Sequence, residues 1–203
     1  MSQQTIVDVT MMTPDDWYEV PLHDEPGARS WAKRLADELD APQSSGLAEF
    51  LREEQRIMDR EPSTVIGLVS VPQPSSGIVD ATIAVQMVLG EPGDTIDVYL
   101  DETLAELRAG ADEQGIRDVE QWRSPHPQGE IAGTSFLFAV PAEQAQSPGA
   151  EQLAQQVTVM LFPTGMHEMV ELTFASPRTA ASDEVIDLVR QLVDELRIVT
   201  EAS

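Results

Sequence analysis

The chain has 203 residues and a formal net charge of −24, because 36 acidic side chains face only 12 Lys and Arg. Cysteine is absent, which excludes disulfides, thiolate metal ligands and cysteine nucleophiles. A field of this sign repels phosphate backbones and anionic headgroups, so we expect no nucleic-acid partner and no membrane insertion. The general explanation of the negative charge is solubility, and the more specific explanation is binding to a basic protein partner.

The ends of the chain and its hydropathy predict where the protein resides. The stretch before Trp17 has neither the basic start nor the apolar segment of a signal peptide. Apolar runs stay short of the roughly 18 residues that a membrane span needs. We therefore expect a cytoplasmic protein. Since neither a repeat nor a linker between two complete cores is visible, we also predict a single α+β domain over residues 1–203, with flexible tails at 1–4 and 200–203.

The first part of the chain carries two amphipathic helix patterns between strand patterns. Trp31, Leu35 and Leu39 recur at four-residue spacing, which predicts one apolar helix face. The second helix ends before Pro62, because proline disfavours helical backbone in the residue before it. In chain order we expect strands over 5–11 and 17–22, helices over 26–39 and 45–60, and strands over 63–71 and 78–89.

The rest of the chain reads as a helix, a run of strands and a last helix. Asp94 is a suitable N-cap for the first of these helices, and Gly110 is a suitable end. The pattern predicts an antiparallel β-sheet with helices packed largely on one face, which is an α+β fold. The expected elements are a helix over 94–110, a strand over 116–123, a loop over 124–129, a strand over 131–140, a polar connection over 141–152, strands over 154–162 and 166–175, and a helix over 182–198.

The string His167-Glu-x-x-Glu171 is one residue short of a zinc-protease signature. That signature needs a helix, in which its two ligands share one face. Here Val170, Leu172 and Phe174 alternate with polar residues, so the segment is predicted to be a strand. In a strand, positions 167 and 171 stand roughly 13 Å apart. We therefore expect neither a metal nor a cofactor at this string.

The strand over 154–162 is apolar on both faces. Met160 and Phe162 alternate with Val159 and Leu161. Either the strand is central and covered on both sides, which is the favoured alternative, or its second face meets a partner. In the second case the partner-binding surface consists of Met160, Phe162, His167 and Met169, and a homodimer through this face is left open.

Catalytic signatures are missing from the sequence. It contains neither a nucleophile elbow nor a phosphate-binding or dinucleotide-binding glycine loop. We therefore expect a non-catalytic bacterial protein-binding or adaptor domain. The alternative is a small-ligand-binding protein or hydrolytic enzyme, with a site built from dispersed acidic residues and His126 or Arg123.

The end of the chain resembles a known family. Residues 156–177 read QVTVMLFPTGMHEMVELTFASP, and the last helix is expected to close on Glu195-Leu196-Arg197-Ile198. These features resemble the Mog1/PsbP-like fold, which includes bacterial LpqN-type proteins. The resemblance implies an antiparallel sheet flanked by helices, and binding of proteins or small ligands without catalysis. We expect the adaptor role to be linked to secretion or envelope machinery. The chain departs from the pattern because it lacks a lipobox and its helix pair over 26–60 is large.

Overall fold

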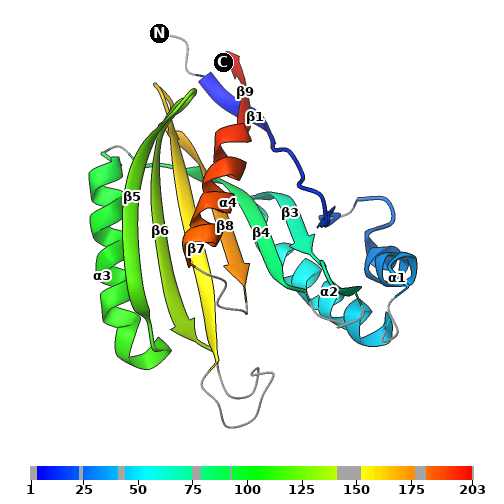
Figure 1. Ribbon diagram of the computed structural model, residues 1–203. Coiled ribbons are helices and arrows are strands. Elements are labelled where there is room, and N and C mark those ends of the chain that lie inside the picture. The colour runs from blue at the N-terminus through cyan, green and yellow to red at the C-terminus, as the bar shows by residue number, and fades with distance from the viewer. Residues whose placement is uncertain are drawn as a thin grey trace. The chain divides into compact units, whose positions relative to one another are not determined.

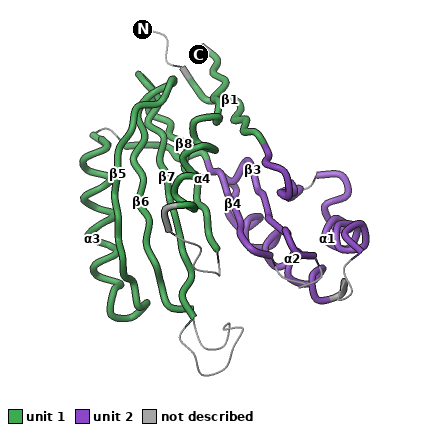
Figure 2. The backbone as a smooth tube through the Cα atoms, viewed as in Figure 1, with its two compact units in different colours: residues 1–12, 87–203 green, residues 13–86 purple. Residues whose placement is uncertain are grey.

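The computed structural model describes residues 4–22, 25–40, 44–74, 79–91, 93–140, 152–176 and 182–202. The chain divides into two compact units (Figure 2). Unit 1 consists of residues 1–12 and 87–203, and unit 2 consists of residues 13–86. The chain passes from unit 2 into unit 1 within strand β4. The single domain that we expect from the sequence stays a prediction.

Unit 2 pairs a small antiparallel sheet with two helices. The sheet has the order β2-β3-β4. Helices α1 and α2 pack on each other, and Trp31, Leu35, Leu47 and Leu51 belong to one buried cluster. The elements are β2 (Trp17–Glu19), α1 (Ala28–Glu38), α2 (Ser44–Met58), β3 (Thr64–Ser70) and β4 (Ala81–Leu89), all close to their expected positions.

Unit 1 holds the main sheet, in the order β8-β7-β6-β5, with every neighbouring pair antiparallel. A separate two-stranded sheet pairs β1 with β9. The elements are β1 (Gln4–Thr10), α3 (Ile96–Gln114), β5 (Arg117–His126), β6 (Gly129–Ala139), β7 (Leu153–Pro163), β8 (Glu168–Ser176), α4 (Ser182–Glu195) and β9 (Arg197–Ala202) (Figure 1). The predicted α+β class and antiparallel sheet are confirmed.

The helices of unit 1 cover opposite faces of its sheet, whereas we expected helices largely on one face. Gln121 on β5 donates a hydrogen bond to the Leu100 carbonyl of α3 at 2.9 Å. Its neighbour Trp122 points the other way, where Arg190 of α4 stacks on the indole with its guanidinium carbon 5.2 Å from the ring centroid. Adjacent residues of a strand face opposite sides. This arrangement explains why β7 carries apolar residues on both faces, with Val159 and Leu161 towards α4 and Met160 and Phe162 towards α3.

The face towards α4 is the apolar core of unit 1. Val189 and Leu192 of α4 are at most 4% exposed, and α4 lies against β7. The sheet presents alternate residues to this core, as the sequence predicted. These buried strand residues are Val157, Val159, Leu161, Val170, Leu172 and Phe174.

The last helix and both chain ends differ from expectation. Helix α4 ends at Glu195, and the following residues form β9, which pairs with β1 from Gln4↔Ala202 onwards. The parts of the predicted tails that the structure describes are therefore strand residues. Gln128 also supports β9, because its side-chain amide bonds both the N–H and the carbonyl of Ile198, each at 2.8 Å. Pairing satisfies backbone groups that a longer helix would have satisfied internally.

Helix α3 begins and ends later than predicted. Thr95 caps it by accepting a hydrogen bond from the Val98 N–H at 3.3 Å, while Asp94 precedes the cap. The helix runs through Gly110 to Gln114 and is capped by Gly115, whose φ of 61° is the left-handed conformation that favours glycine. The predicted loop over 124–129 is also shorter, because β5 continues to His126. The connection over 141–151 lies outside the described residues.

Candidate functional site

A hollow of about 400 Å³ lies in unit 1 where α3 faces the sheet. We call it the α3 groove. Its walls come from α3 and the residue that leads into β5, and its floor comes from β6, β7 and β8. The residues that line it are Tyr99, Thr103, Glu106, Leu107, Gln114, Ile116, Thr134, Phe136, Gln156, Thr158, Glu171 and Thr173.

A row of threonines crosses the floor of the α3 groove. Thr134 pairs with Thr158, and Thr158 pairs with Thr173, so one register line carries three hydroxyl groups across β6, β7 and β8. Gln121 extends the line onto β5 and donates a hydrogen bond to the Thr134 hydroxyl at 3.4 Å. Each hydroxyl can donate one hydrogen bond and accept others, so the row suits a polar ligand.

Glu171 stands at one end of the groove, beside Tyr99. Its carboxylate accepts a hydrogen bond from the Thr173 hydroxyl at 3.5 Å. Burial raises the pKa of Glu171, and the Thr173 bond only partly opposes that effect. Burial, and then the negative charge of Glu171, raises the pKa of Tyr99, so the phenol keeps its proton at neutral pH. The Tyr99 ring packs edge-on against Phe162, with 5.8 Å between ring centroids.

The pKa shift of Glu171 predicts a pH-dependent effect of Glu171→Gln. Because the folded-state pKa lies above the ordinary value of 4.5, protonated Glu171 stabilises the fold at lower pH, and this contribution is lost as pH rises through the folded pKa. Glutamine does not titrate. We therefore expect the variant to gain stability relative to the parent between about pH 4 and about pH 7. Urea unfolding at both pH values measures this difference. Glu120→Gln, an exposed change outside the groove, is the control, and an equal pH response in both variants would contradict the prediction.

The structure places most of the sequence-predicted partner surface inside unit 1. Met160 and Met169 are 3% and 8% exposed, and Phe162 is half-buried against Tyr99. Only His167 of the four is exposed, and its carbonyl accepts a hydrogen bond from the Gly90 N–H at 2.8 Å. Met160 and Phe162 share the α3 side of β7 with Thr158, so they are covered on the side where a partner was considered.

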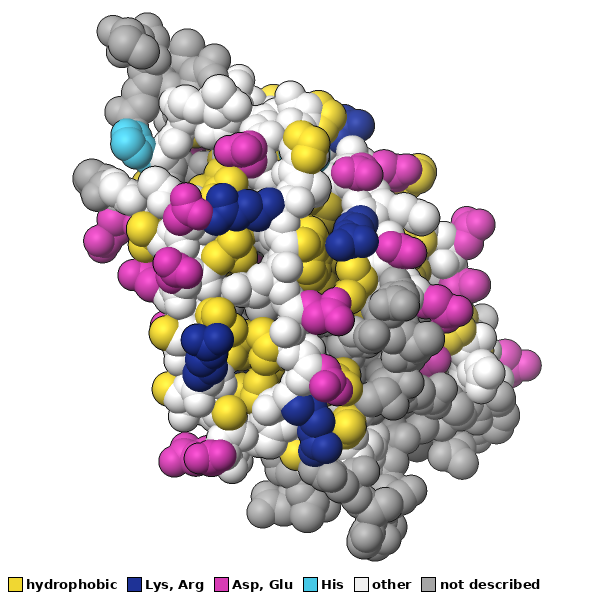
Figure 3. Space-filling view, turned by 60° about the vertical axis from the view of Figure 1, so that its left-hand side comes forward, with side chains coloured by type: hydrophobic (Ala, Val, Ile, Leu, Met, Phe, Trp, Pro, Cys, Tyr) yellow, Lys and Arg dark blue, Asp and Glu magenta, His cyan; other side chains and the backbone are white. Residues whose placement is uncertain are grey.

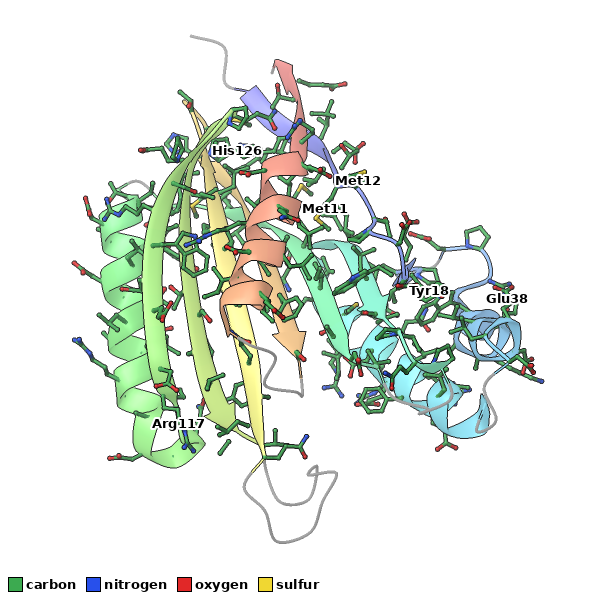
Figure 4. The ribbon with its side chains drawn as sticks, in the orientation of Figure 1. Met11, Met12, Tyr18, Glu38, Arg117 and His126 are labelled. Atoms are coloured by element: carbon green, nitrogen blue, oxygen red, sulfur yellow. The ribbon has the colours of Figure 1, made fainter. Side chains whose placement is uncertain are left out.

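Arg123 and His126 are not brought together. Arg123 forms an ion pair with Asp97, next to the start of α3. His126 is buried on the opposite face, near the C-terminal end of α4 (Figure 4), and accepts a hydrogen bond from the Gln128 N–H at 3.1 Å. Burial, and then the charge of Arg197, lowers the pKa of His126. The two side chains therefore belong to different surroundings and do not form one site. The remaining histidine, His23, lies outside the described residues.

The predicted strand at the histidine string is confirmed, because β8 begins at Glu168, directly after His167. Glu171 therefore points into the α3 groove. Across the described ranges, there is no group of three or more His, Cys, Asp or Glu side chains that could hold a metal ion. Within the same part of the chain, the helices are all too short or too polar to cross a membrane.

Sequence reasoning placed Glu171 and Thr173 on one strand face but missed Thr134 and Thr158. A polar residue at alternate positions of a strand reads as ordinary solvent exposure. The signal that could have found the row is the register between strands, which puts three such positions in line.

The fold and groove define an α+β protein with a hollow under a helix. Comparison with family models finds none that matches, and comparison with curated proteins finds no match either. One solved structure to which the chain is similar is that of LpqN, described as involved in cell envelope biogenesis of Mycobacterium tuberculosis. The two are 12% identical over 97% of this chain and 91% of that chain, with a TM-score of 0.48. This is a weak structural similarity to LpqN, and the broader Mog1/PsbP-like relationship stays a prediction.

Proposed function

We propose that this chain is a non-catalytic protein that binds a small polar ligand in the α3 groove. The observation that carries the proposal is the convergence of the threonine row, Glu171 and Tyr99 on one hollow of about 400 Å³. Ligand sites generally have about 300–1,000 Å³ and a few polar groups that fix the ligand's orientation. The groove has that size and that mixture of polar and apolar walls.

The position of the threonine row favours a role in ligand binding over a purely structural role in packing α3 on the sheet. A helix that covers a sheet normally meets an apolar face, because polar groups taken out of water must find partners. Here Met160, Phe162 and Met169 form an apolar part of the α3 side, and the hydroxyls of Thr158 and Thr173 and the carboxyl of Glu171 stand beside it, beneath α3. These groups now bond one another and nearby amides, since Gln121 donates to Thr134, Gln156 to Thr158 and Thr173 to Glu171. A ligand with donors and acceptors of its own would add to these bonds or replace them. The alternative of a ligand-binding or hydrolytic site built from acidic residues and either His126 or Arg123 stays a prediction, and the two side chains lie apart.

The protein-binding or adaptor role expected from the sequence stays a second prediction. On the face drawn in Figure 3, charged side chains of both signs stand among the apolar ones. Leu89 and Met12 are the most exposed large apolar side chains of unit 1, at 76% and 61%, and single exposed apolar residues are ordinary on a protein surface. The basic partner, the cytoplasmic location and the link to envelope machinery stay predictions as well.

Fragment screening by NMR tests the proposal. The library contains small polar compounds that are cationic, anionic or neutral. We expect some of them to shift the amide signals of Thr158 and Thr173 in the ¹⁵N-labelled protein. Thr158→Val removes one floor hydroxyl at nearly constant volume and should weaken the best of them about fivefold, as expected for one hydrogen bond. Thr10→Val, an exposed change on β1, should leave affinity unchanged. A screen without groove shifts, or binding that ignores Thr158→Val, would overturn the proposal.

A further inference from the structure

We infer that the ligand of the α3 groove is a small organic cation, with an ammonium group on a short apolar stem. The inference rests on the proposed function. It follows from the charge of the groove, from the arrangement of its two ends and from the groups around Tyr99.

The groove carries negative charge from two different elements. Glu171 rises from β8, and Glu106 projects from α3. Both carboxylates act on the same phenol, since each of their charges contributes to the raised pKa of Tyr99. An ammonium group near Tyr99 would therefore be attracted by both carboxylates at once, whereas a carboxylate or phosphate ligand would be repelled by both.

The described lining offers these carboxylates no basic partner. The twelve lining residues include Glu106 and Glu171 but not Lys, Arg or His. Arg123, which lies on the same side of the sheet, is engaged by Asp97. A partly buried carboxylate without a cation is costly, and the cost falls when a positive group binds beside it. Glu171 is half-buried, so the ligand's ammonium would supply that missing charge.

The other end of the groove combines apolar side chains with the amides of Gln114 and Gln156, and Gln156 is the register partner of Phe136. Phe136 and Ile116 line it there, and Leu107 lies on the helix wall. The pairing of β6, β7 and β8 places Phe136 two register rows beyond Glu171, roughly 13 Å along the sheet. The hydroxyls of the threonine row lie between these ends. A ligand that fits this order has a charged head, a short apolar stem and room for a polar substituent between them.

Three probes of similar length, one cationic, one neutral and one anionic, show how the charge of the ligand affects its affinity for the groove. We expect hexylammonium to shift the amide signals of Glu171, Thr173 and Phe136 at neutral pH, and to bind about tenfold more tightly than 1-hexanol or hexanoate. The strong negative charge of the whole protein would also favour any cation, so the probes alone are not decisive.

Paired variants distinguish the effect of the groove carboxylates on cation affinity from the effect of the protein's overall negative charge. Glu171→Gln and Asp101→Asn each remove one negative charge, but Asp101 is exposed and lies two residues after Tyr99, on the far side of the helix. We expect Glu171→Gln to lower the hexylammonium affinity about tenfold while the 1-hexanol affinity stays the same. Asp101→Asn should change neither. Glu106→Gln repeats the test on the helix side, without altering the sheet.

The possible results separate the two proposals. Equal binding of the three probes in the groove, or equal losses in Glu171→Gln and Asp101→Asn, would overturn the cation inference and leave the ligand groove standing. Absence of groove shifts with all three probes would also overturn the inference. In that case, a fragment hit sensitive to Thr158→Val keeps the proposed function, and a negative screen removes both.

Discussion

Leu192→Ala is expected to lower the free energy of unfolding by about 2–5 kcal/mol, the usual cost of truncating a buried leucine. Leu192 is 4% exposed on α4, and this helix covers the apolar face of the unit 1 sheet. Truncation removes buried methyl groups and leaves a cavity that a packed helix and sheet can only partly close. Urea unfolding followed through the amide signals of β7 and β8 measures the loss in unit 1.

The neighbouring Gln191→Ala is the matched control. Gln191 is exposed on the same helix, so its replacement should change stability by about 0.5 kcal/mol or less. Equal urea midpoints for Leu192→Ala and Gln191→Ala would show that α4 is not packed on the sheet. That result would also remove the reason for assigning the Val157, Val159 and Leu161 face of β7 to α4 and the Thr158 face to α3.

The second large effect is expected at Gly129, where β6 begins. A Cβ atom at this position would lie 2.0 Å from the Phe162 carbonyl oxygen and 2.9 Å from the Pro163 Cα. Both are backbone atoms of the paired strand β7, so neither can move aside by changing a rotamer. We expect Gly129→Ala to cost about 3 kcal/mol, because β6 and β7 must separate there to admit the methyl group.

Gly46→Ala tests the same substitution where space is free. Gly46 lies in α2, and a Cβ there would meet no atom within 4 Å beyond its neighbours and the helix's own backbone. Alanine loses less backbone entropy than glycine in a helix, so this change should stabilise by about 0.5–1 kcal/mol. Thermal or urea unfolding of both variants should therefore show shifts of opposite sign. A Gly129→Ala protein as stable as its parent would mean that the close β6–β7 approach is absent.

Strong periodicity made the regular elements predictable. The alternation of Val170, Leu172 and Phe174 identified β8, and the four-residue spacing of Trp31 and Leu35 identified α1. Local chemistry was a weaker guide to ends. Asp94 and Gly110 both suit helix termini, but Thr95 and Gly115 serve instead, because a glycine inside a helix costs only about 1 kcal/mol and tertiary packing can outweigh it.

The sequence by itself determined the strand and helix periods, the apolar face of the main sheet and the strand geometry that separates His167 from Glu171 as metal ligands. Only the tertiary structure decided that α3 and α4 lie on opposite faces, that β9 replaces the end of the last helix and that Thr134, Thr158 and Thr173 form one row. Periodicity acts between residues a few positions apart, so it can be read from one chain. Strand register and the choice of face depend on distant segments, whose pairing the local pattern does not encode.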